Sequence, residues 1–334
     1  MRWLACIGVK GDLPFLRKTG GLERHWQRAQ RARDGKQPGV CWLCDAGTPH
    51  GGPFEDFNTN SKWKTLPVTE PWGQRPSVLD LYHSPAKPQD VFRPDMWRNF
   101  HGGAGKTFLG SALAEALRLL DGAKGARCEQ LNEHLRSWVE KTGNIMPFSG
   151  EFKAERISLS SYQVLPEANW SEHNDTYIYC KFLQAFLEER ETEVKEDGIL
   201  CRVLDAVQSI NRCFSILYTG GLWLERAESR EAGAAGRRFL RRYAECADIC
   251  MRARKLRFPV YVKFHMLDHS FRGMLERSDR YEWCINDLMD SVQMDEDFVG
   301  HCARISRGVS PVTTAFRVLQ RYLVRAHQVW FPKK

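Results

Sequence analysis

The sequence predicts a mostly α-helical chain with a small α/β part. Roughly half of the residues follow the apolar spacing that is typical of amphipathic helices. Strand-like patterns occur only at residues 2–9 and 281–286. Between the first strand and the first long helix, residues 34–90 are rich in Gly, Pro, Asn and Asp and indicate an irregular loop. A loop of this length inside a compact domain is usually functional or held by an anchor.

The N-terminal elements follow from short local patterns. Residues 3–9 form a continuous apolar run, which is typical of a buried strand. Asp12 comes soon after this run and would stand at the exit of the strand. Because a chain rarely begins on a buried strand, we expect a truncated domain whose earlier strands are missing. Gly20 and Gly21 then interrupt the chain before a short basic helix over residues 22–33.

The rest of the chain is predicted to be helical. A helix start at Pro94 is followed by a glycine break at residues 102–105 and by a clear amphipathic pattern from Lys106. The spacing predicts further helices over residues 127–141, 176–193, 199–218, 230–255, 260–276, 295–307 and 312–330. Three tryptophans are expected to pin the preceding loop, namely Trp42, Trp63 and Trp72.

Composition limits the class of protein. The chain has 334 residues and an ordinary hydrophobic content of 43%, enough to bury the core of one large or two smaller domains. The net charge of +8 weakly favours an anionic partner. Eleven cysteines is an odd number, so we expect buried thiols in a reducing compartment, not a disulfide framework. No apolar run approaches the ~18 residues of a membrane span.

Two pairs of metal-ligating residues stand far apart in the sequence. Cys41 and Cys44 form a CxxC pair, and His265 and His269 share one face of a predicted helix. Two thiolates and two imidazoles suit tetrahedral Zn²⁺, and each short segment supplies two ligands. The site therefore requires the fold to join the two ends of the chain. Cys44 with His50 is an alternative local pair, and each motif alone also occurs without a metal.

The stretch HGGAGKT, ending at Lys106 and Thr107, resembles a phosphate-binding P-loop. The motif requires a glycine where this chain has Phe100, and a buried strand before it. Both are absent from the sequence. We therefore interpret the glycines as a bend before a helix.

Three carboxylates are candidates for a divalent cation site. Asp12 follows the first strand, Asp95 begins a helix, and Glu296 is the centre of an acidic cluster. Converging carboxylates hold Mg²⁺, and two such ions activate a water and a leaving oxygen in phosphodiester chemistry. The simpler interpretation is that Asp12 caps a turn and Asp95 is a first-turn helix charge.

Two arginine-rich helix faces are candidates for contacts with phosphates. A solvated helix face is the simpler interpretation of each. The first face contains Arg237, Arg238, Arg241 and Arg242, and the second contains Arg317, Arg321 and Arg325.

In order and spacing, these residues resemble a cut-and-paste DNA transposase of the DDE type, nearest to the CACTA, hAT and V(D)J-recombinase-like groups. In those groups a catalytic Asp ends a strand, and a CxxC and a long helical insertion follow. A helical HxxxH then completes a zinc site before the catalytic Glu. The same order runs here from Asp12 through Cys41 and Cys44 to His265, His269 and Glu296.

The resemblance implies a partial ribonuclease H-like core with a large all-helical insertion. The core would comprise residues 1–100 and 258–334, and the insertion residues 101–257. Zinc would be structural, Mg²⁺ would be catalytic, and the partners would be DNA and a second copy of the chain, in the nucleus. The family has an earlier catalytic Asp, so either that residue is missing or Asp12 and Asp95 are the two aspartates.

One family signature, Asp-x-x-His, ends here on Arg98 instead of His. We therefore expect the isolated chain to bind DNA but to cleave it only if the missing part is supplied. Two other functions compete with this one. The first is a non-enzymatic helical interaction protein with incidental Cys and His residues, and the second is a P-loop nucleotide hydrolase.

Overall fold

The computed structural model describes residues 8–81, 83–157, 165–166, 168–170 and 172–331. Helix makes up 63% of the structure and strand 4%, which confirms the predicted predominance of helix. The chain forms two compact units, Met1–Asp290 and Ser291–Lys334. The division at residues 100 and 257 stays a prediction.

A short parallel strand pair lies at the start of the first unit. β1 (Val9–Lys10) pairs with β2 (Phe92–Arg93), so that the chain returns to its start after the long loop. Most of the strand expected over residues 3–9 lies outside the described residues. An aspartate follows each strand after one further residue and caps a helix. Asp12 accepts a hydrogen bond from Phe15 N at the start of α1 (Leu13–Thr19).

The long loop has little regular structure, as predicted. Before the loop, the basic helix expected over residues 22–33 is formed in part, by η1 (Trp26–Arg28) and α2 (Ala29–Arg33). The short helical elements of the loop are α3 (Lys62–Thr65), η2 (Ser77–Asp80) and η3 (Pro88–Val91). The side chains of Trp42, Trp63 and Trp72 are all buried. Little hydrogen-bonded secondary structure holds the loop in place. The burial of these three tryptophan side chains therefore anchors it.

The glycine-rich stretch is helical, so the predicted break is wrong. α4 (Met96–Asn99) continues through a π-helical turn, η4 (Phe100–Ala104), into α5 (Gly105–Ala116). A Cβ atom on Gly105 would lie 2.5 Å from Thr176 Cγ2. Close packing against a neighbouring helix explains this glycine, and a strand–loop–helix P-loop is not formed.

The other predicted helices of the first unit are present with shifted ends. They are α6 (Lys124–Thr142), α7 (Asp175–Glu188), α8 (Glu191–Glu196), α9 (Leu200–Thr219), α10 (Arg226–Arg252) and α11 (Val262–Arg280). The helix expected over residues 176–193 is divided in two, α7 and α8. Short 3₁₀ turns accompany them at η5 (Leu117–Leu119), η6 (Ala154–Ile157) and η7 (Asp287–Asp290). The expected strand near residues 281–286 is β4 (Trp283–Ile285), which pairs antiparallel with β3 (Trp223–Glu225).

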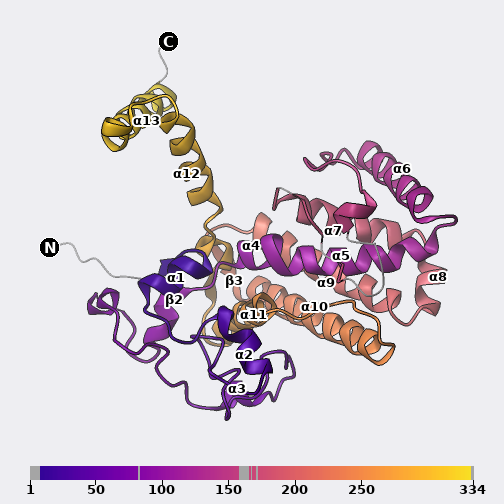
Figure 1. The fold of residues 1–334 in the computed structure, drawn as a ribbon, viewed down its shortest axis with the longest axis horizontal. Helices are drawn as coiled ribbons and strands as arrows, with labels where there is room; N and C mark the ends of the chain where they lie inside the picture. The colour runs from indigo at the N-terminus through magenta and orange to yellow at the C-terminus, as the bar shows by residue number, and fades with distance from the viewer. Residues whose placement is uncertain (1–7, 82, 158–164, 167, 171, 332–334) are drawn as a thin grey trace. The chain divides into compact units, whose positions relative to one another are not determined.

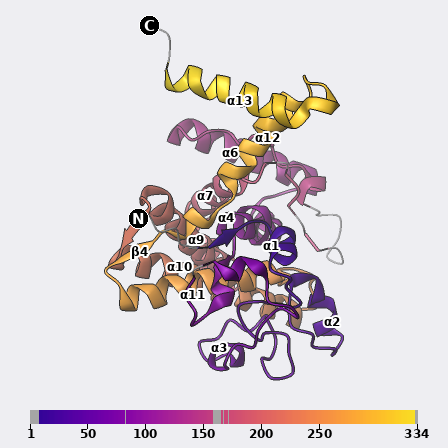
Figure 2. The same ribbon diagram turned by 90° about the vertical axis from the view of Figure 1, so that its left-hand side faces the viewer.

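Two hydrophobic cores meet at α11. The larger core fills the space between the long helices, with α10 packed along both α9 and α11 (Figures 1 and 2). The smaller core holds the N-terminal loop, including Leu16, Trp42 and Phe92. α11 contributes Phe264 to the larger core and Met266 to the smaller one. This helix is therefore the wall against which the N-terminal loop folds.

Most cysteines are buried, as predicted. Cys180, Cys213, Cys246 and Cys250 are inaccessible in the larger core, whereas Cys201 is half-buried. The cysteines of the described ranges form no disulfide with one another. A search of the same ranges for a helix with the length and hydropathy of a membrane span found none.

The second unit consists of α12 (Gln293–Ser306) and α13 (Thr314–Trp330), joined by the turn η8 (Pro311–Thr313). Tyr322 of α13 packs edge-to-face on Phe298 of α12, with ring centroids 5.0 Å apart. Large apolar side chains of α13, such as Phe316 and Trp330, remain exposed within this unit.

Candidate metal centre

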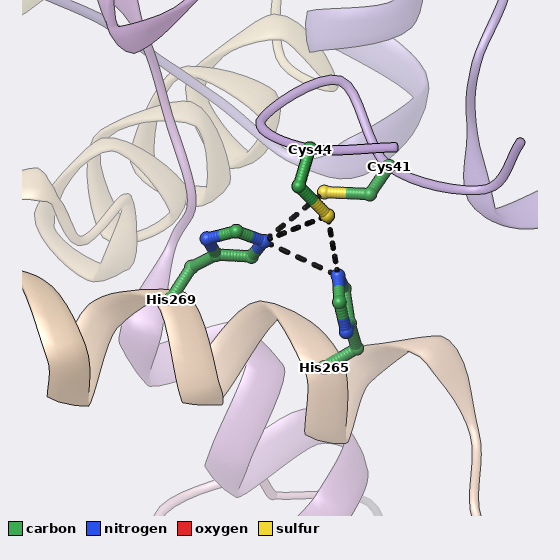
Figure 3. Close-up of side chains that lie close together, drawn as sticks. All are labelled: Cys41, Cys44, His265 and His269. Atoms are coloured by element: carbon green, nitrogen blue, oxygen red, sulfur yellow. Dashed lines mark hydrogen bonds between the residues drawn. The ribbon is translucent and has the colours of Figure 1, made fainter. Parts of the chain in front are cut away.

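The two predicted ligand pairs meet in space. Cys41 and Cys44 lie in the loop between α2 and α3, and His265 and His269 lie one turn apart on α11 (Figure 3). The four ligand atoms all lie within 4.8 Å of one another. The prediction that the fold joins residues more than two hundred positions apart is thus confirmed.

The distances suit a tetrahedral ion. His265 Nε2 lies 3.2 Å from both His269 Nε2 and Cys44 Sγ. His269 Nε2 lies 3.4 Å from each of the two sulfur atoms, Cys41 Sγ and Cys44 Sγ. Zinc bond lengths of about 2.0–2.3 Å with tetrahedral angles place two nitrogens about 3.3 Å apart and a nitrogen about 3.5 Å from a sulfur. The residues therefore fit Zn²⁺.

The cysteine loop is shaped by its own backbone. Gly39 N donates to Gly47 O and Val40 N to Ala46 O, which closes the loop around the two sulfurs. Gly39 and Gly47 have φ values of 78° and 77°, a conformation that favours glycine. The sequence therefore needs glycine on both sides of the CxxC pair to form this turn.

Backbone groups complete the surroundings of the ligands. Leu43 N lies 3.3 Å from Cys41 Sγ and Ala46 N lies 3.4 Å from Cys44 Sγ, as donors to the sulfurs. On the other side, Nδ1 of His265 lies 3.1 Å from Phe54 O. A hydrogen bond at Nδ1 orients the ring so that Nε2 faces the ion. Sequence motifs do not reveal these partners, because they are backbone atoms.

Most of the centre is buried, whereas His269 is half-buried and lines a cavity with Cys44 and Trp63. Cys41, Cys44 and His265 are inaccessible or nearly so. Trp63 covers both imidazoles, with its ring centroid 4.5 Å from that of His265 and 5.1 Å from that of His269. Next to His269, Asp268 is fully buried and accepts a hydrogen bond from Arg272. A site with four protein ligands and no open position has a structural role.

Without a bound metal, the interactions among the four side chains favour the thiolate form of Cys41. Burial alone would raise the pKa of Cys41, but hydrogen bonds from Cys44 and His265 and the charge of His269 hold it well below its ordinary value. Burial and the Cys41 sulfur raise the pKa of Cys44. Burial would lower the pKa of His269, but facing Cys41 raises it. Cys41 is thus ready as a thiolate, the form that binds a metal.

Two of the three predicted carboxylates share a cavity. Asp12 and Asp95 both line a cavity of about 710 Å³ near the ends of β1 and β2. Arg98 connects them, because its Nη1 lies 3.6 Å from Asp12 Oδ2 and its backbone N donates to Asp95 Oδ1. Each aspartate is also the N-cap of a helix, Asp12 of α1 and Asp95 of α4, whereas the simpler interpretations of the sequence are a turn residue and a first-turn charge.

Glu296 lies on α12 in the second unit. Its side chain is outside the described part of the chain, so its convergence with Asp12 and Asp95 stays a prediction.

The first arginine-rich face divides into buried and exposed members. Arg237 is buried, donates to Phe57 O and lies 3.4 Å from Asp268, so that it is a partner of the core. Arg238 and Arg242 both bind Asp205, and Arg241 is exposed. Contacts of these arginines with DNA stay a prediction.

Comparisons with known protein families, with curated proteins and with solved structures find no match to this chain.

Proposed function

We propose that this chain is a transposase-derived DNA-binding protein of the DDE type, built on a partial ribonuclease H-like core. In this proposal zinc joins the cysteine loop to α11, Asp12 and Asp95 bind Mg²⁺, and Glu296 stays the predicted third carboxylate. Strand cleavage and transfer on DNA would take place in the nucleus.

The observation that carries the proposal is the placement of two aspartates after paired strands. Asp12 follows β1 and Asp95 follows β2, and each lies two positions beyond the last residue of its strand. Because the two strands run parallel, both aspartates lie at the same edge. Carboxylates grouped at one edge of parallel strands are arranged to hold Mg²⁺ on a phosphate substrate.

The metal centre supports the same proposal. The resemblance requires that a CxxC early in the chain and a helical HxxxH late in the chain form one site. Cys41, Cys44, His265 and His269 meet in that way, and α11 fixes the loop that separates β1 from β2. Zinc would thereby stabilise the strand pair that carries the aspartates.

Binding of a divalent cation tests the proposal without requiring catalysis. Mn²⁺, a spectroscopic substitute for Mg²⁺, is expected to bind the zinc-loaded chain and to be lost in Asp12→Asn and Asp95→Asn, as followed by electron paramagnetic resonance. Asp80→Asn removes an exposed carboxylate outside the cavity and serves as the matched control. Equal Mn²⁺ affinity in all three variants would contradict the proposal.

Any Mg²⁺-dependent nicking of plasmid DNA by the chain is expected to disappear in Glu296→Ala, with zinc content and folding unchanged. Nicking that persists in this variant would remove Glu296 from the site.

A non-enzymatic interaction protein remains the second candidate, and the exposed apolar residues of α13 favour it. This function is supported instead if the zinc-loaded chain binds neither Mn²⁺ nor DNA and forms a stable homodimer in light-scattering measurements.

A further inference from the structure

The cavity beside Asp12 and Asp95 has an excess of positive charge. Its lining includes four cationic side chains, those of Arg33, Arg98, Lys106 and Lys263, against these two carboxylates. Two of the cations already have acidic partners. Arg33 Nε lies 3.3 Å from Glu55, and Arg98 pairs with Asp12. With these two pairs set aside, Lys106, Lys263 and Asp95 remain, so the lining retains an excess of one positive charge.

Lys106 and Lys263 are half-buried and donate only to backbone oxygens. Lys106 Nζ lies 2.6 Å from Trp170 O, and Lys263 Nζ lies 2.8 Å from Gly102 O. Neither ammonium forms an ion pair with a carboxylate of the described residues. An ammonium has three donors, so each lysine retains hydrogen-bonding capacity. Burial lowers the pKa of both groups, and for Lys263 the nearby Arg98 and Lys106 lower it further.

A buried amide on the same wall also lacks a partner. Asn99 is 2% exposed and lines the cavity, and its Nδ2 atom has no hydrogen-bond partner among the described residues. Leaving a buried amide unsatisfied is unfavourable by roughly 1–3 kcal/mol. A ligand with oxygen acceptors would supply the missing bond.

The helix leaves space for such a ligand. Asn99 and Lys106 stand on either side of the π-helical turn, and both line the cavity. Gly102 and Gly103 lie between them and also line the cavity. A Cβ on Gly103 would lie 2.1 Å from Lys263 Cδ, so a larger residue here would displace that lysine from its present position. The π-helical turn at this point is a feature that often marks functional sites.

We propose that this cavity binds a phosphate group, held by the ammonium groups of Lys106 and Lys263 and by the side-chain amide of Asn99. Two cations and one amide donor suit an oxyanion with several acceptor oxygens, and a phosphate fits easily within the cavity. The inference rests on the proposed function for the source of the phosphate, which is a DNA strand. A free phosphate compound has the same chemistry, so the experiment includes both.

The test measures binding of two probes to the zinc-loaded chain without added Mg²⁺. Fluorescence anisotropy follows a labelled single-stranded DNA, and calorimetry follows inorganic pyrophosphate. Lys106→Gln and Lys263→Gln retain a donor for the backbone oxygens and remove the charge. Each is expected to weaken binding by about tenfold, as for loss of one charge-assisted hydrogen bond. Lys141→Gln removes an exposed lysine of α6 and should bind like wild type.

Two further variants keep the test decisive if a lysine variant folds poorly. Asn99→Asp changes the shape little and places a negative charge in the cavity, so binding should fall by at least as much. Gly103→Ala should displace Lys263 and weaken binding. Its control, Gly125→Ala on α6, meets no atom within 4 Å. Zinc content and the thermal midpoint report whether each variant is folded.

If the lysine variants lose binding of both probes, or of DNA alone, the inference is supported and DNA is the source of the phosphate. Loss of pyrophosphate alone supports a site for a free phosphate compound and places DNA binding elsewhere, against the proposed function. Binding of both probes within twofold of wild type in the folded variants would overturn the inference, as would wild-type protein that binds neither probe. Suppose that Mn²⁺ binding does not depend on Asp12 and Asp95, while pyrophosphate binding does depend on the two lysines. The proposed function would then be rejected, and the phosphate site would stand.

Discussion

The metal centre and the carboxylate cavity differ in how far their polar groups find partners within the protein. At the centre, the four ligand atoms lie close together, a backbone carbonyl accepts from the other nitrogen of His265, and Trp63 packs against both imidazoles. In the cavity, a buried amide has no hydrogen-bond partner among the described residues, and two ammonium groups donate only to backbone oxygens. The contrast teaches that the first site is complete with an ion alone, whereas the second requires an external ligand.

Removal of a metal ligand should have the largest effect. Cys44→Ser and His265→Ala are each expected to reduce bound zinc from one per chain to none and to lower the thermal midpoint strongly, because the smaller core that contains the cysteines loses its metal. The physical reason is that a structural zinc supplies roughly 10 kcal/mol or more of folding free energy in small zinc domains. Metal analysis and circular dichroism measure both effects.

Cys201→Ser is the matched control, since this half-buried thiol lies outside the centre. A ligand variant that retains zinc and melts like this control would show that the four side chains hold no ion.

The acid stability of the protein should reveal the charge in the cavity. Burial, followed by the charges of Lys106, Lys263 and Arg98, lowers the pKa of His173 from 6.5 to about 4. Folding thus favours the neutral ring. The stability that this histidine contributes is fully present above pH 6.5 and is lost as the pH falls through about 4.

His173→Gln should therefore lose less stability than wild type between pH 6.5 and 4, in thermal scans at each pH. In Lys106→Gln, the His173 pKa measured by nuclear magnetic resonance should rise toward its ordinary value. An unchanged pKa would mean that the lysine charge does not reach the ring, and it would weaken the contrast between the two sites.

The sequence was informative where chemistry lies in side chains and regular spacing. The HxxxH pair, the CxxC pair and the long amphipathic helices such as α9 could all be predicted. β3 was not predicted, because its partner β4 lies far along the chain and the pairing leaves no local pattern beside the start of α10. The glycines before Lys106 indicated a break by propensity alone, whereas packing against Thr176 and Lys263 keeps them helical. Phe54 O is a backbone atom and has no sequence signature.

The smallest effect should separate the two roles of Asp95. Its carboxylate caps α4 by accepting a hydrogen bond from Arg98 N, and it also lines the cavity. Asp95→Ala should lower the free energy of unfolding by about 1 kcal/mol, the usual effect of a lost N-cap. Asp95→Asn retains an acceptor oxygen and should unfold within about 0.5 kcal/mol of wild type, because Asn caps helices as well as Asp does.

Urea denaturation measures both variants, with zinc content as a check that the metal centre is intact. If Asp95→Asn loses as much stability as Asp95→Ala, the charge itself stabilises the fold, as it does for a buried partner of cationic groups. Asp95 would then resemble the groups around the zinc ligands, whose charges and hydrogen bonds are satisfied within the protein. If only Asp95→Ala is destabilised, the charge of this 3%-exposed carboxylate is dispensable for folding and is available for binding a cation.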